Sequence, residues 1–496
     1  MTLTHLRGWD GPWAGLRVLV AGLGATGFSA ADTLAELNCR VIVVDGAATD
    51  TKQQDAETLR IVGVEDIRFG EPATRSLDAF DDGAAPDLVI TSPGWRPESP
   101  VIAAATAAGV PVWSDIQLAH RLGARPGARS PEWLTVTGTN GKTTTVSLLE
   151  KMLHADGRRA VACGNIGLPI LDAIRDPEGY DVLAVELSSF QLHYTEPLSA
   201  TASAVLNVAY DHIDWHGSFA DYVAAKAKIY TGTRVACVYN AADPLTEQMV
   251  AQADVVEGCR AISFTTDTPD ISQVGLVEDL LVDRAFLQQR RHRALELATL
   301  ADFGPLAPQH LVANGLAAAA LARAAGVSPE NVQAGIRAYQ PGEHRIQPVA
   351  TADDILWVND SKATNPHAAE ASLSSFTDVV WIAGGLPKGV DYDPLVTAVA
   401  GRLRHVVLIG ADTAPLASSL ARHAPEVPVT AVGGGDDGVQ AMNAAVEAAG
   451  AVAQPGQTVL LSPAAASQDQ FASYAARGEA FIEAVARRMT RLGFND

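Results

Sequence analysis

The chain has 496 residues, of which 48% are hydrophobic and 19% charged, and its formal net charge is −21. Its length predicts several domains, with three as the natural number. The acidic balance argues against nucleic-acid or anionic-membrane partners, and we find neither a membrane-spanning apolar run nor the apolar core of a signal peptide.

The four cysteines (Cys39, Cys163, Cys237 and Cys259) are scattered along the chain without a Cys-x-x-Cys pair. This usage fits a reducing compartment. We therefore expect a cytoplasmic protein that acts as a monomer, without membrane insertion.

The first predicted elements form a β-α-β unit with a glycine turn. A strand over 16–22 precedes the turn, a helix over 28–38 follows it, and a second strand covers 40–45. The alternation continues through 87–94, 99–109 and 110–113. This order is typical of a doubly wound α/β domain.

A Gly/Pro/Arg-rich stretch from Arg121 to Glu132 predicts a linker. A second α/β series begins after it, with strands expected at 133–138, 181–189, 202–209 and 234–240. A third series follows His344, with strands expected at 355–360, 378–385, 405–411, 427–434 and 458–467.

We therefore expect an α/β protein of three domains, with boundaries near residues 120 and 341. Residues 1–120 are predicted to be Rossmann-like, residues 121–341 to resemble a P-loop ATPase, and residues 342–496 to be Rossmann-like again.

The first glycine loop has the pattern Gly22-x-Gly24-x-x-Gly27, and Asp45 ends the next strand. The spacing suits a dinucleotide such as NAD, with Asp45 on a ribose. A sugar nucleotide can use the same helix N-terminus, and a tight packing turn without a ligand is the third interpretation.

The second glycine loop, "TGTNGKTT", follows a predicted strand and precedes a predicted helix. Its amides can hold phosphates, Lys142 can reach the β and γ oxygens, and Thr143 can bind Mg²⁺. It departs from the general P-loop pattern because Val136 stands where the first glycine belongs.

Lysine is rare in this chain, with seven lysines against 29 arginines. Arginine evidently serves for ordinary surface charge, so each lysine is a candidate for a compact, titratable amine. Four of the seven fall in motifs: Lys142, Lys226, Lys362 and Lys388.

The strings "TGTNGKTT", "ELSSFQL" and "DHIDWHGSFADYVAAKAK" resemble the Mur ligases and their folylpolyglutamate synthase relatives. "ELSSFQL" points to the D-glutamate-adding members. The resemblance implies that the first loop holds the UDP of a sugar nucleotide and the second holds ATP. The implied reaction is ATP-dependent ligation of D-glutamate to UDP-N-acetylmuramoyl-L-alanine through an acyl phosphate, in peptidoglycan precursor synthesis.

The resemblance also implies roles for residues at the ATP loop and beyond it. The implied catalytic residues are Lys142, Glu186, His212, Lys226 and Lys362. ATP is expected on Gly138, Thr139, Asn140, Gly141, Lys142, Thr143, Thr144, Asn314, Arg345 and Asp360. Mg²⁺, at two sites, is expected on Thr143, Glu186, His212 and Lys226, the last as a carbamate formed from CO₂.

Two further sets of residues are implied for the other substrates. The UDP substrate is expected on Gly24, Ala25, Thr26, Asp45, Ser92, Pro93, Gly94, Asn165, Gln191 and His212. D-Glutamate is expected on Lys362, Thr364, Lys388, Ser467, Gln468 and Tyr474. The chain departs from the family pattern at Gly46, Ala47, Leu311, Gln468 and Tyr474.

Four alternatives stay open at this point. One is a sibling ligase that adds another amino acid, and another is a folylpolyglutamate synthase, although that enzyme has little use for a UDP-binding domain. An NAD-dependent oxidoreductase explains the first glycine loop but leaves the second idle. A non-catalytic nucleotide-sensing scaffold would make Glu186 and Lys226 dispensable.

Overall fold

The computed structural model describes residues 3–78, 80, 83–304, 306–387, 389–432 and 437–493. Three sheets follow one another along the chain. The first two lie in one compact unit, residues 1–307 and 311–339, and the third lies in a second unit, residues 308–310 and 340–496. Among the described helices, none combines the length and apolarity needed to cross a bilayer.

The first sheet has five parallel strands in the order β3-β2-β1-β4-β5. Its strands are β1 (Arg17–Ala21), β2 (Arg40–Asp45), β3 (Asp66–Phe69), β4 (Leu88–Thr91) and β5 (Val112–Ser114). Its helices are α1 (Ala25–Glu36), α2 (Asp50–Ile61), α3 (Pro100–Ala107) and α4 (Asp115–Leu122). The strand order reverses between β1 and β4, which is where doubly wound folds bind ligands.

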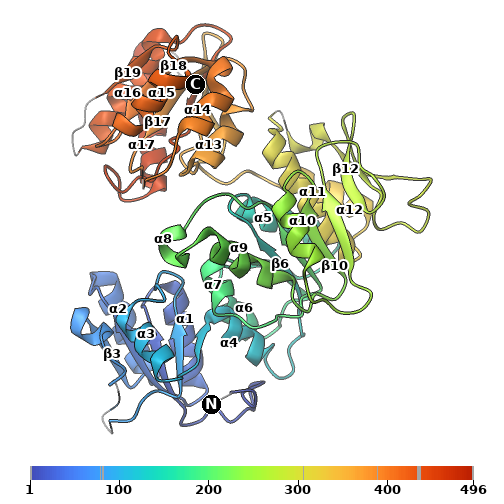
Figure 1. Ribbon diagram of the computed structural model, residues 1–496, viewed down its shortest axis with the longest axis vertical. Coiled ribbons are helices and arrows are strands. Elements are labelled where there is room, and N and C mark those ends of the chain that lie inside the picture. The colour runs from blue at the N-terminus through green and yellow to red at the C-terminus, as the bar shows by residue number, and fades with distance from the viewer. Residues whose placement is uncertain are drawn as a thin grey trace. The chain divides into compact units, whose positions relative to one another are not determined.

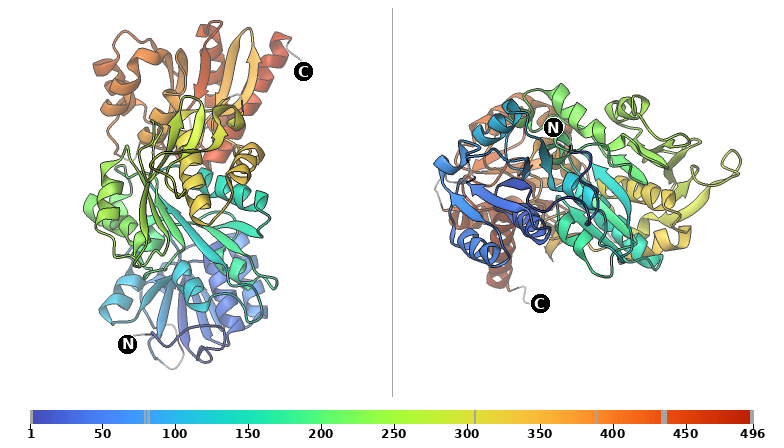
Figure 2. Two further views of the ribbon diagram at one scale, coloured as in Figure 1. Left: turned by 90° about the vertical axis from the view of Figure 1, so that its right-hand side faces the viewer. Right: turned by 90° about the horizontal axis from the view of Figure 1, so that it is seen from below.

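Both faces of this sheet are covered, as the alternation of buried residues along β1 shows. Val18 and Val20 pack in the cluster that contains α1, whereas Leu19 and Ala21 pack in the cluster that contains α3. Helices accordingly flank the strands on two sides (Figure 2). A strand buried on both faces reads as a continuous apolar run, and "RVLVA" is such a run.

The second sheet has nine strands in the order β14-β13-β12-β11-β10-β9-β6-β8-β7. The strands are β6 (Glu132–Thr137), β7 (Ala160–Gly164), β8 (Val182–Glu186), β9 (Ala202–Val205), β10 (Ala236–Asn240), β11 (Arg260–Phe264), β12 (Gln273–Val277), β13 (Leu280–Asp283) and β14 (Leu295–Thr299). The helices are α5 (Lys142–Ala155), α6 (Ile170–Arg175), α7 (Ser189–His193), α8 (Ile213–His216), α9 (Phe219–Ala227), α10 (Pro244–Ala251), α11 (Gln309–Ala324) and α12 (Pro329–Ala338). Strands β6 to β12 pair in parallel, and β13 and β14 extend the sheet antiparallel.

A shared core joins the first two sheets. Val18 and Val20 of β1 belong to the same apolar cluster as Leu183 and Val185 of β8. Near the loop after β6, helices α7, α8 and α9 gather beside one another (Figure 1). The expected linker is shorter than predicted, because Arg121 and Leu122 complete α4 and Glu132 begins β6. Arg121 is buried and pairs with Glu196.

The third sheet has six strands in the order β15-β16-β20-β17-β18-β19. The strands are β15 (Gln347–Ala352), β16 (Ile355–Asn359), β17 (Val379–Gly384), β18 (Leu403–Ile409), β19 (Val429–Ala431) and β20 (Thr458–Leu461). The helices are α13 (Pro366–Leu373), α14 (Asp393–Val399), α15 (Ala414–His423), α16 (Gly438–Val452) and α17 (Tyr474–Leu492). All pairings are parallel except that of β15 with β16.

Candidate active site

Hydrogen bonds from neighbouring segments fix the conformation of the loop between β6 and α5. The side chain of Asn207 accepts a hydrogen bond from the Asn140 backbone N–H (2.9 Å) and donates one to the Asn140 carbonyl (3.1 Å). The Thr139 hydroxyl lies 2.9 Å from the Tyr222 hydroxyl and accepts from the backbone of Ala209. The loop backbone is therefore fixed before any anion reaches it.

Gly141 must be a glycine here for two reasons. Its φ of 85° lies in the left-handed region, and a Cβ would lie 2.3 Å from Oδ1 of Asn314. Asn314 is buried on α11, so the structure brings this predicted residue against the second glycine loop. Lys142, Thr143 and Thr144 form the first turn of α5, directly after Gly141.

Glu186 is the carboxylate beside this loop, and it is only 2% exposed. One carboxylate oxygen accepts from the Thr143 hydroxyl at 2.8 Å, and the other accepts from the Asn165 amide at 2.9 Å. Carboxylate and hydroxyl oxygens are the ligands that Mg²⁺ prefers. The strand end β8 and the helix start α5 thus hold a donor set suited to Mg²⁺ next to a phosphate-binding loop.

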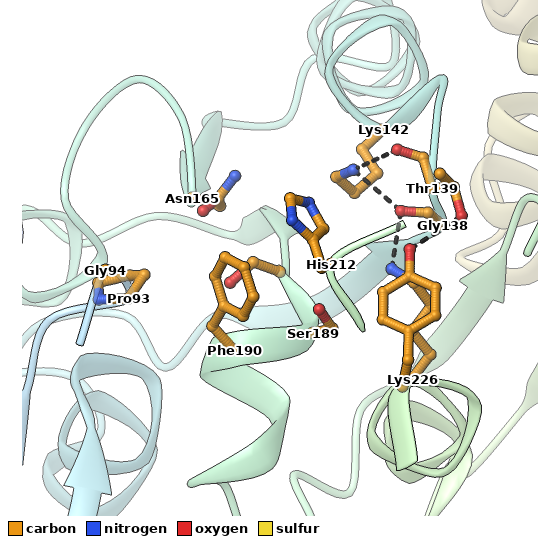
Figure 3. A pocket seen from close by; sticks show the side chains of 12 residues that line it. Pro93, Gly94, Gly138, Thr139, Lys142, Asn165, Ser189, Phe190, His212 and Lys226 are labelled. Carbon is orange, nitrogen blue, oxygen red and sulfur yellow. Dashed lines mark hydrogen bonds between the residues drawn. The ribbon is translucent and has the colours of Figure 1, made fainter. Parts of the chain in front are cut away.

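Two lysine amines meet at the carbonyl of Gly138 (Figure 3). Lys226 Nζ donates to this oxygen at 2.8 Å and Lys142 Nζ donates to it at 2.9 Å. Lys226 is 2% exposed and lies over the Tyr222 ring. Burial, with repulsion from Lys142, holds the pKa of Lys226 well below its usual value. The buried amine beside the second glycine loop is therefore biased toward its neutral form.

His212 lies across the pocket from these amines. It has a left-handed backbone, with φ of 55°, at the start of α8, and its ring contacts Phe190 at 4.9 Å between centroids. Burial lowers the pKa of His212, and Lys226 and Lys142 lower it further against the opposing effect of Asp211. The imidazole is therefore biased toward its neutral form.

Lys142, Lys226 and His212 line one cavity of about 200 Å³. Its walls are Pro93, Gly94, Gly138, Thr139, Lys142, Asn165, Ser188, Ser189, Phe190, His212, Tyr222 and Lys226. The cavity brings together predicted residues from the ends of four strands, namely β4, β6, β7 and β9. Such convergence at the carboxyl edge of parallel strands is typical of a functional site.

A second cavity, of about 520 Å³, lies at the first glycine loop. Its walls are Gly22, Leu23, Gly24, Asp45, Gly46, Ala47, Lys52, Ser92, Gly94, Trp95, Arg96 and Ser99. Gly94 therefore lines both cavities. Gly22 has φ of 100°, and a Cβ on Gly27 would lie 1.8 Å from the Gly22 carbonyl oxygen, which explains both glycines.

Asp45 has more partners than the sequence suggested. It accepts hydrogen bonds from the backbone of Leu23 and Ala47, and Lys52 Nζ lies 2.7 Å from both carboxylate oxygens. Burial raises the pKa of Asp45, but these hydrogen bonds and the Lys52 charge outweigh burial and lower it. Asp45 is therefore held as a carboxylate at the end of β2.

Three residues expected at the UDP substrate do not line either cavity. Ala25 and Thr26 begin α1 beside the first loop. Gln191 is buried, caps α7 through Ser188 and donates to Asp115 at 3.1 Å. Burial raises the pKa of Asp115 to about 6. Gln191 thus connects α7 to α4 behind the cavity wall.

In the second unit, Asp360 is buried and supports the segment that carries Arg345. Its carboxylate accepts from the Ile346 backbone at 3.2 Å and from the hydroxyls of Ser462 and Ser372. Burial raises the pKa of Asp360 to about 7. Arg345 is half-buried between His344 and Ile346, both with positive φ.

The residues expected at D-glutamate include both buried and exposed side chains. Lys362 Nζ lies 3.7 Å from the centroid of the Tyr474 ring, and the Thr364 backbone N–H donates to the Lys362 carbonyl. Ser467 is 1% exposed, and its hydroxyl has no hydrogen-bond partner among the described residues. Gln468 is exposed. The prediction for Lys388 lies outside the described residues.

Several cavity or loop residues escaped sequence reasoning. Ser189 stood inside "ELSSFQL" but received no role, and Lys52 and Trp95 carry no motif of their own. Arg477 is 1% exposed and donates to Ser361 and to the carbonyls of Ala465 and Ala466. The only sequence signal for Arg477 was its place as an arginine in the first turn of the amphipathic helix α17.

Comparison with known proteins gives three family matches along the chain. Residues 16–114 match the MurD-like N-terminal domain of Mur ligases, residues 136–322 the Mur ligase middle domain, and residues 344–465 the Mur ligase glutamate ligase domain. UDP-N-acetylmuramoylalanine–D-glutamate ligase of Streptomyces avermitilis is 53% identical, with 95% of this chain and 98% of the relative covered. The ligase of the same name from Leifsonia xyli subsp. xyli is 51% identical over 97% of this chain and 95% of its own.

Solved structures share the fold at low identity. MurF from Acinetobacter baumannii aligns with a TM-score of 0.58 at 16% identity, covering 89% of this chain and 90% of that one. UDP-N-acetylmuramate-alanine ligase MurC from Thermotoga maritima aligns with a TM-score of 0.51 at 17% identity, covering 95% and 100%. The resemblance inferred from "TGTNGKTT" and "ELSSFQL" is thus confirmed along the whole chain, and the protein belongs to the Mur ligase family.

Proposed function

We propose that this protein joins D-glutamate to UDP-N-acetylmuramoyl-L-alanine with hydrolysis of ATP to ADP and phosphate. The observation that carries the proposal is the pair of cavities that share Gly94, one at each glycine loop. A substrate with a nucleotide at one end and a reacting carboxylate at the other fits such a pair. Relatives about half identical to the chain bear the name of this ligase.

In this proposal the nucleotide end lies in the larger cavity. Its diphosphate would approach Gly24, Ala25 and Thr26 at the start of α1, where backbone amides and the helix dipole favour anions. Asp45, Ser92 and Gly94 of this cavity would complete this end, with Pro93 from the wall of the smaller cavity. The muramoyl-alanyl end would pass Gly94 to reach Asn165 and His212, with Gln191 supporting the wall from behind.

ATP is proposed at the second loop, with its phosphates on Gly138 to Thr144 and its base near Asn314. Lys142 would leave the loop carbonyls to which it donates and neutralise the transferred phosphoryl group. Thr143 and Glu186 supply hard oxygen donors, and they fit Mg²⁺. Mg²⁺ when bound would offset the negative charge that ATP and the carboxylate bring together.

Lys226 is proposed to carry a carbamate, formed when its neutral amine attacks CO₂ and loses a proton. The buried position and the depressed pKa of Lys226 suit this reaction, because only an uncharged amine is a nucleophile. The new carboxylate-like group would face His212 in the same cavity and would serve as a ligand of the second Mg²⁺. A protonated Lys226 would be repelled by Lys142, whereas the carbamate would be attracted to it.

The chemistry then runs in two steps. The alanyl carboxylate attacks the γ-phosphorus of ATP, and ADP leaves. The amine of D-glutamate attacks the resulting acyl phosphate, loses a proton and expels phosphate, which leaves the amide. Lys142 is proposed to stabilise the negative charge that develops during phosphoryl transfer, and Lys362 the charge that develops when D-glutamate attacks.

The second unit is proposed to supply the amino acid and to complete the ATP site. Arg345 and Asp360 would serve ATP, with Asp360 acting through the segment that it supports. Lys362, Thr364, Lys388, Ser467, Gln468 and Tyr474 would bind D-glutamate. The buried Ser467 hydroxyl without a partner is a donor that a carboxylate would satisfy. We place the reaction in the cytoplasm and the active form as a monomer.

Phosphate release from ATP and Mg²⁺ with UDP-N-acetylmuramoyl-L-alanine tests the proposal. The assay compares D-glutamate with L-glutamate, L-alanine, L-lysine and meso-diaminopimelate. We expect turnover with D-glutamate alone. Turnover with another amino acid would assign the chain to a sibling activity, and no turnover with any of them would reject the ligase proposal.

A further inference from the structure

The cavity at the second loop contains a hydroxyl whose orientation is set from behind. Ser189 is 2% exposed, begins α7 and lines the cavity with Lys142, His212 and Lys226. Its Oγ lies 2.9 Å from Nε2 of His216, the last residue of α8. His216 itself does not line the cavity.

The other ring nitrogen of His216 identifies the tautomer. Nδ1 is buried and has no hydrogen-bond partner among the described residues. The ring lies against aromatic neighbours, with centroids 5.7 Å from Phe190, 4.5 Å from Trp215 and 5.4 Å from Tyr222. A proton on Nδ1 would be a buried donor without an acceptor, which is the arrangement that folded proteins avoid most.

The charged form of this ring is also disfavoured. Burial lowers the pKa of His216 to about 4, and the neighbouring His193 and His212 lower it in the same direction, as does Lys226. Asp221 opposes them. A neutral ring carries one proton, and the Nδ1 environment directs that proton to Nε2.

We propose that His216 is a positioning residue that makes the Ser189 hydroxyl a hydrogen-bond donor to the substrate's reacting carboxylate. Nε2–H donates to Ser189 Oγ, so the Ser189 proton points away from His216. The Ser189 O–H is then available in a cavity where negative oxygen is expected. This inference rests on the proposed function for the identity of the anion.

An aromatic cluster packs against the His216 ring that donates to Ser189. The rings of Phe190, Trp215 and Tyr222 keep water from Nδ1 and hold the imidazole in one orientation. A hydroxyl that donates to an anion in such a site adds more than a neutral hydrogen bond does. The gain appears only when the carboxylate, or the phosphorylated form of it, is present.

A double-mutant cycle tests the proposal. We expect Ser189→Ala to lower kcat/KM for the UDP substrate by about tenfold to a hundredfold, since it removes a hydrogen bond to a charged group. His216→Phe should lower it by up to the same factor, since it removes the group that directs the Ser189 proton. The double variant should fall no further than Ser189→Ala, because without Ser189 there is no donor for His216 to direct. His216→Gln, which keeps a donor near Nε2, should recover most of the loss.

His193→Phe is the matched control. His193 belongs to the same ring cluster, with its centroid 5.3 Å from Trp215, but it does not line the cavity. Its replacement should leave turnover close to wild type. Thermal unfolding of every variant separates loss of fold from loss of the donor. Single effects that multiply in the double variant would overturn the proposal.

The tautomer can be measured without any turnover. In protein with ¹⁵N-labelled histidine, long-range ¹H–¹⁵N correlation should show the His216 proton on Nε2, assigned by its absence in His216→Gln. A proton on Nδ1 would also overturn the proposal. An inactive wild-type enzyme with the Nε2 tautomer would instead reject the proposed ligase activity and keep the hydrogen bond.

Discussion

The glycine loop after β1 and the glycine loop after β6 each connect a strand to a helix, but their surroundings differ. Both follow a parallel strand and open a helix, so both offer amides to an anion. At the first loop the cations that line the cavity are paired, Lys52 with Asp45 and Arg96 with Asp214. At the second loop two lysine amines share one backbone carbonyl beside Glu186.

If phosphates bind as proposed, this difference implies that the loop backbone holds them, while the side chains around it determine whether they react. A neutralised loop can hold a diphosphate without activating it. A loop with concentrated amines and a metal-binding carboxylate can stabilise charge that moves during transfer. Changes at the second loop should therefore alter kcat, and changes at the first should alter KM.

The largest effect is expected from Lys226→Arg. Arginine places a permanent positive charge at this buried position and cannot form the carbamate, so we expect kcat to fall by about a thousandfold, a loss of several kcal/mol of charge stabilisation. Steady-state ligation measures this. Lys228→Arg, two residues along the same segment and outside the cavity, is the matched control and should be nearly neutral. An active Lys226→Arg enzyme would contradict the carbamate.

A smaller effect is expected from Glu186→Gln. The amide preserves the size of the side chain and can still accept from Thr143, but it removes the charge that would hold Mg²⁺. We expect kcat to fall by about a hundredfold and the Mg²⁺ concentration for half-maximal rate to rise. Titration of Mg²⁺ at saturating ATP measures both. An unchanged Mg²⁺ dependence would remove Glu186 from the metal site.

The first loop should behave differently when Lys52 is replaced by methionine. The stem of the side chain is kept, but Asp45 loses its counter-ion and faces the UDP end of the substrate as an uncompensated carboxylate. We expect KM for the UDP substrate to rise by about tenfold with kcat nearly constant. A fall in kcat with constant KM would break the contrast between the two loops.

The hydrogen bond from Gln191 to Asp115, which joins α7 to α4, should affect stability alone. Burial raises the pKa of Asp115 above its unfolded value, so its contribution to stability is complete at low pH and is lost as pH rises through about 6. Asp115→Asn has no such titration and can still accept from Gln191. Relative to wild type, the variant should gain about 3 kcal/mol between pH 4 and pH 7.

Denaturant unfolding of both proteins at several pH values measures this difference. A difference between variant and wild type that does not change with pH would mean that Asp115 is ionised throughout. Turnover should change little in the variant, because Asp115 does not line either cavity.

Much of the fold could be predicted from local patterns. The apolar runs of β1, β8 and β17 are buried on both faces, so composition alone identifies them as strands of parallel sheets. The antiparallel strands β13 and β14, of four and five residues, were not predicted, because strands this short carry little pattern. Helix α4 was missed because its polar residues Asp115 and Gln117 are buried, against the usual pattern.

The residues of the candidate site likewise divide into those that motifs predicted and those that only the structure revealed. Lys142, Glu186 and Lys226 were predicted because each lies at a fixed position in a motif. The partnership of Lys52 with Asp45, and of His216 with Ser189, depends on contacts between elements, and sequence spacing does not encode them. The crowding of Lys142 and Lys226 at one carbonyl likewise required coordinates.

Gly94 has a consequence for inhibitor design. It lines both cavities, and a Cβ built on it would meet no heavy atom within 4 Å, so the two cavities adjoin at a residue with open space beside it. Two weak fragments, one in each cavity, could be joined across it by a short linker. The second fragment would then bind at an effective concentration in the millimolar range or above, and the joined molecule would bind far more tightly than either part.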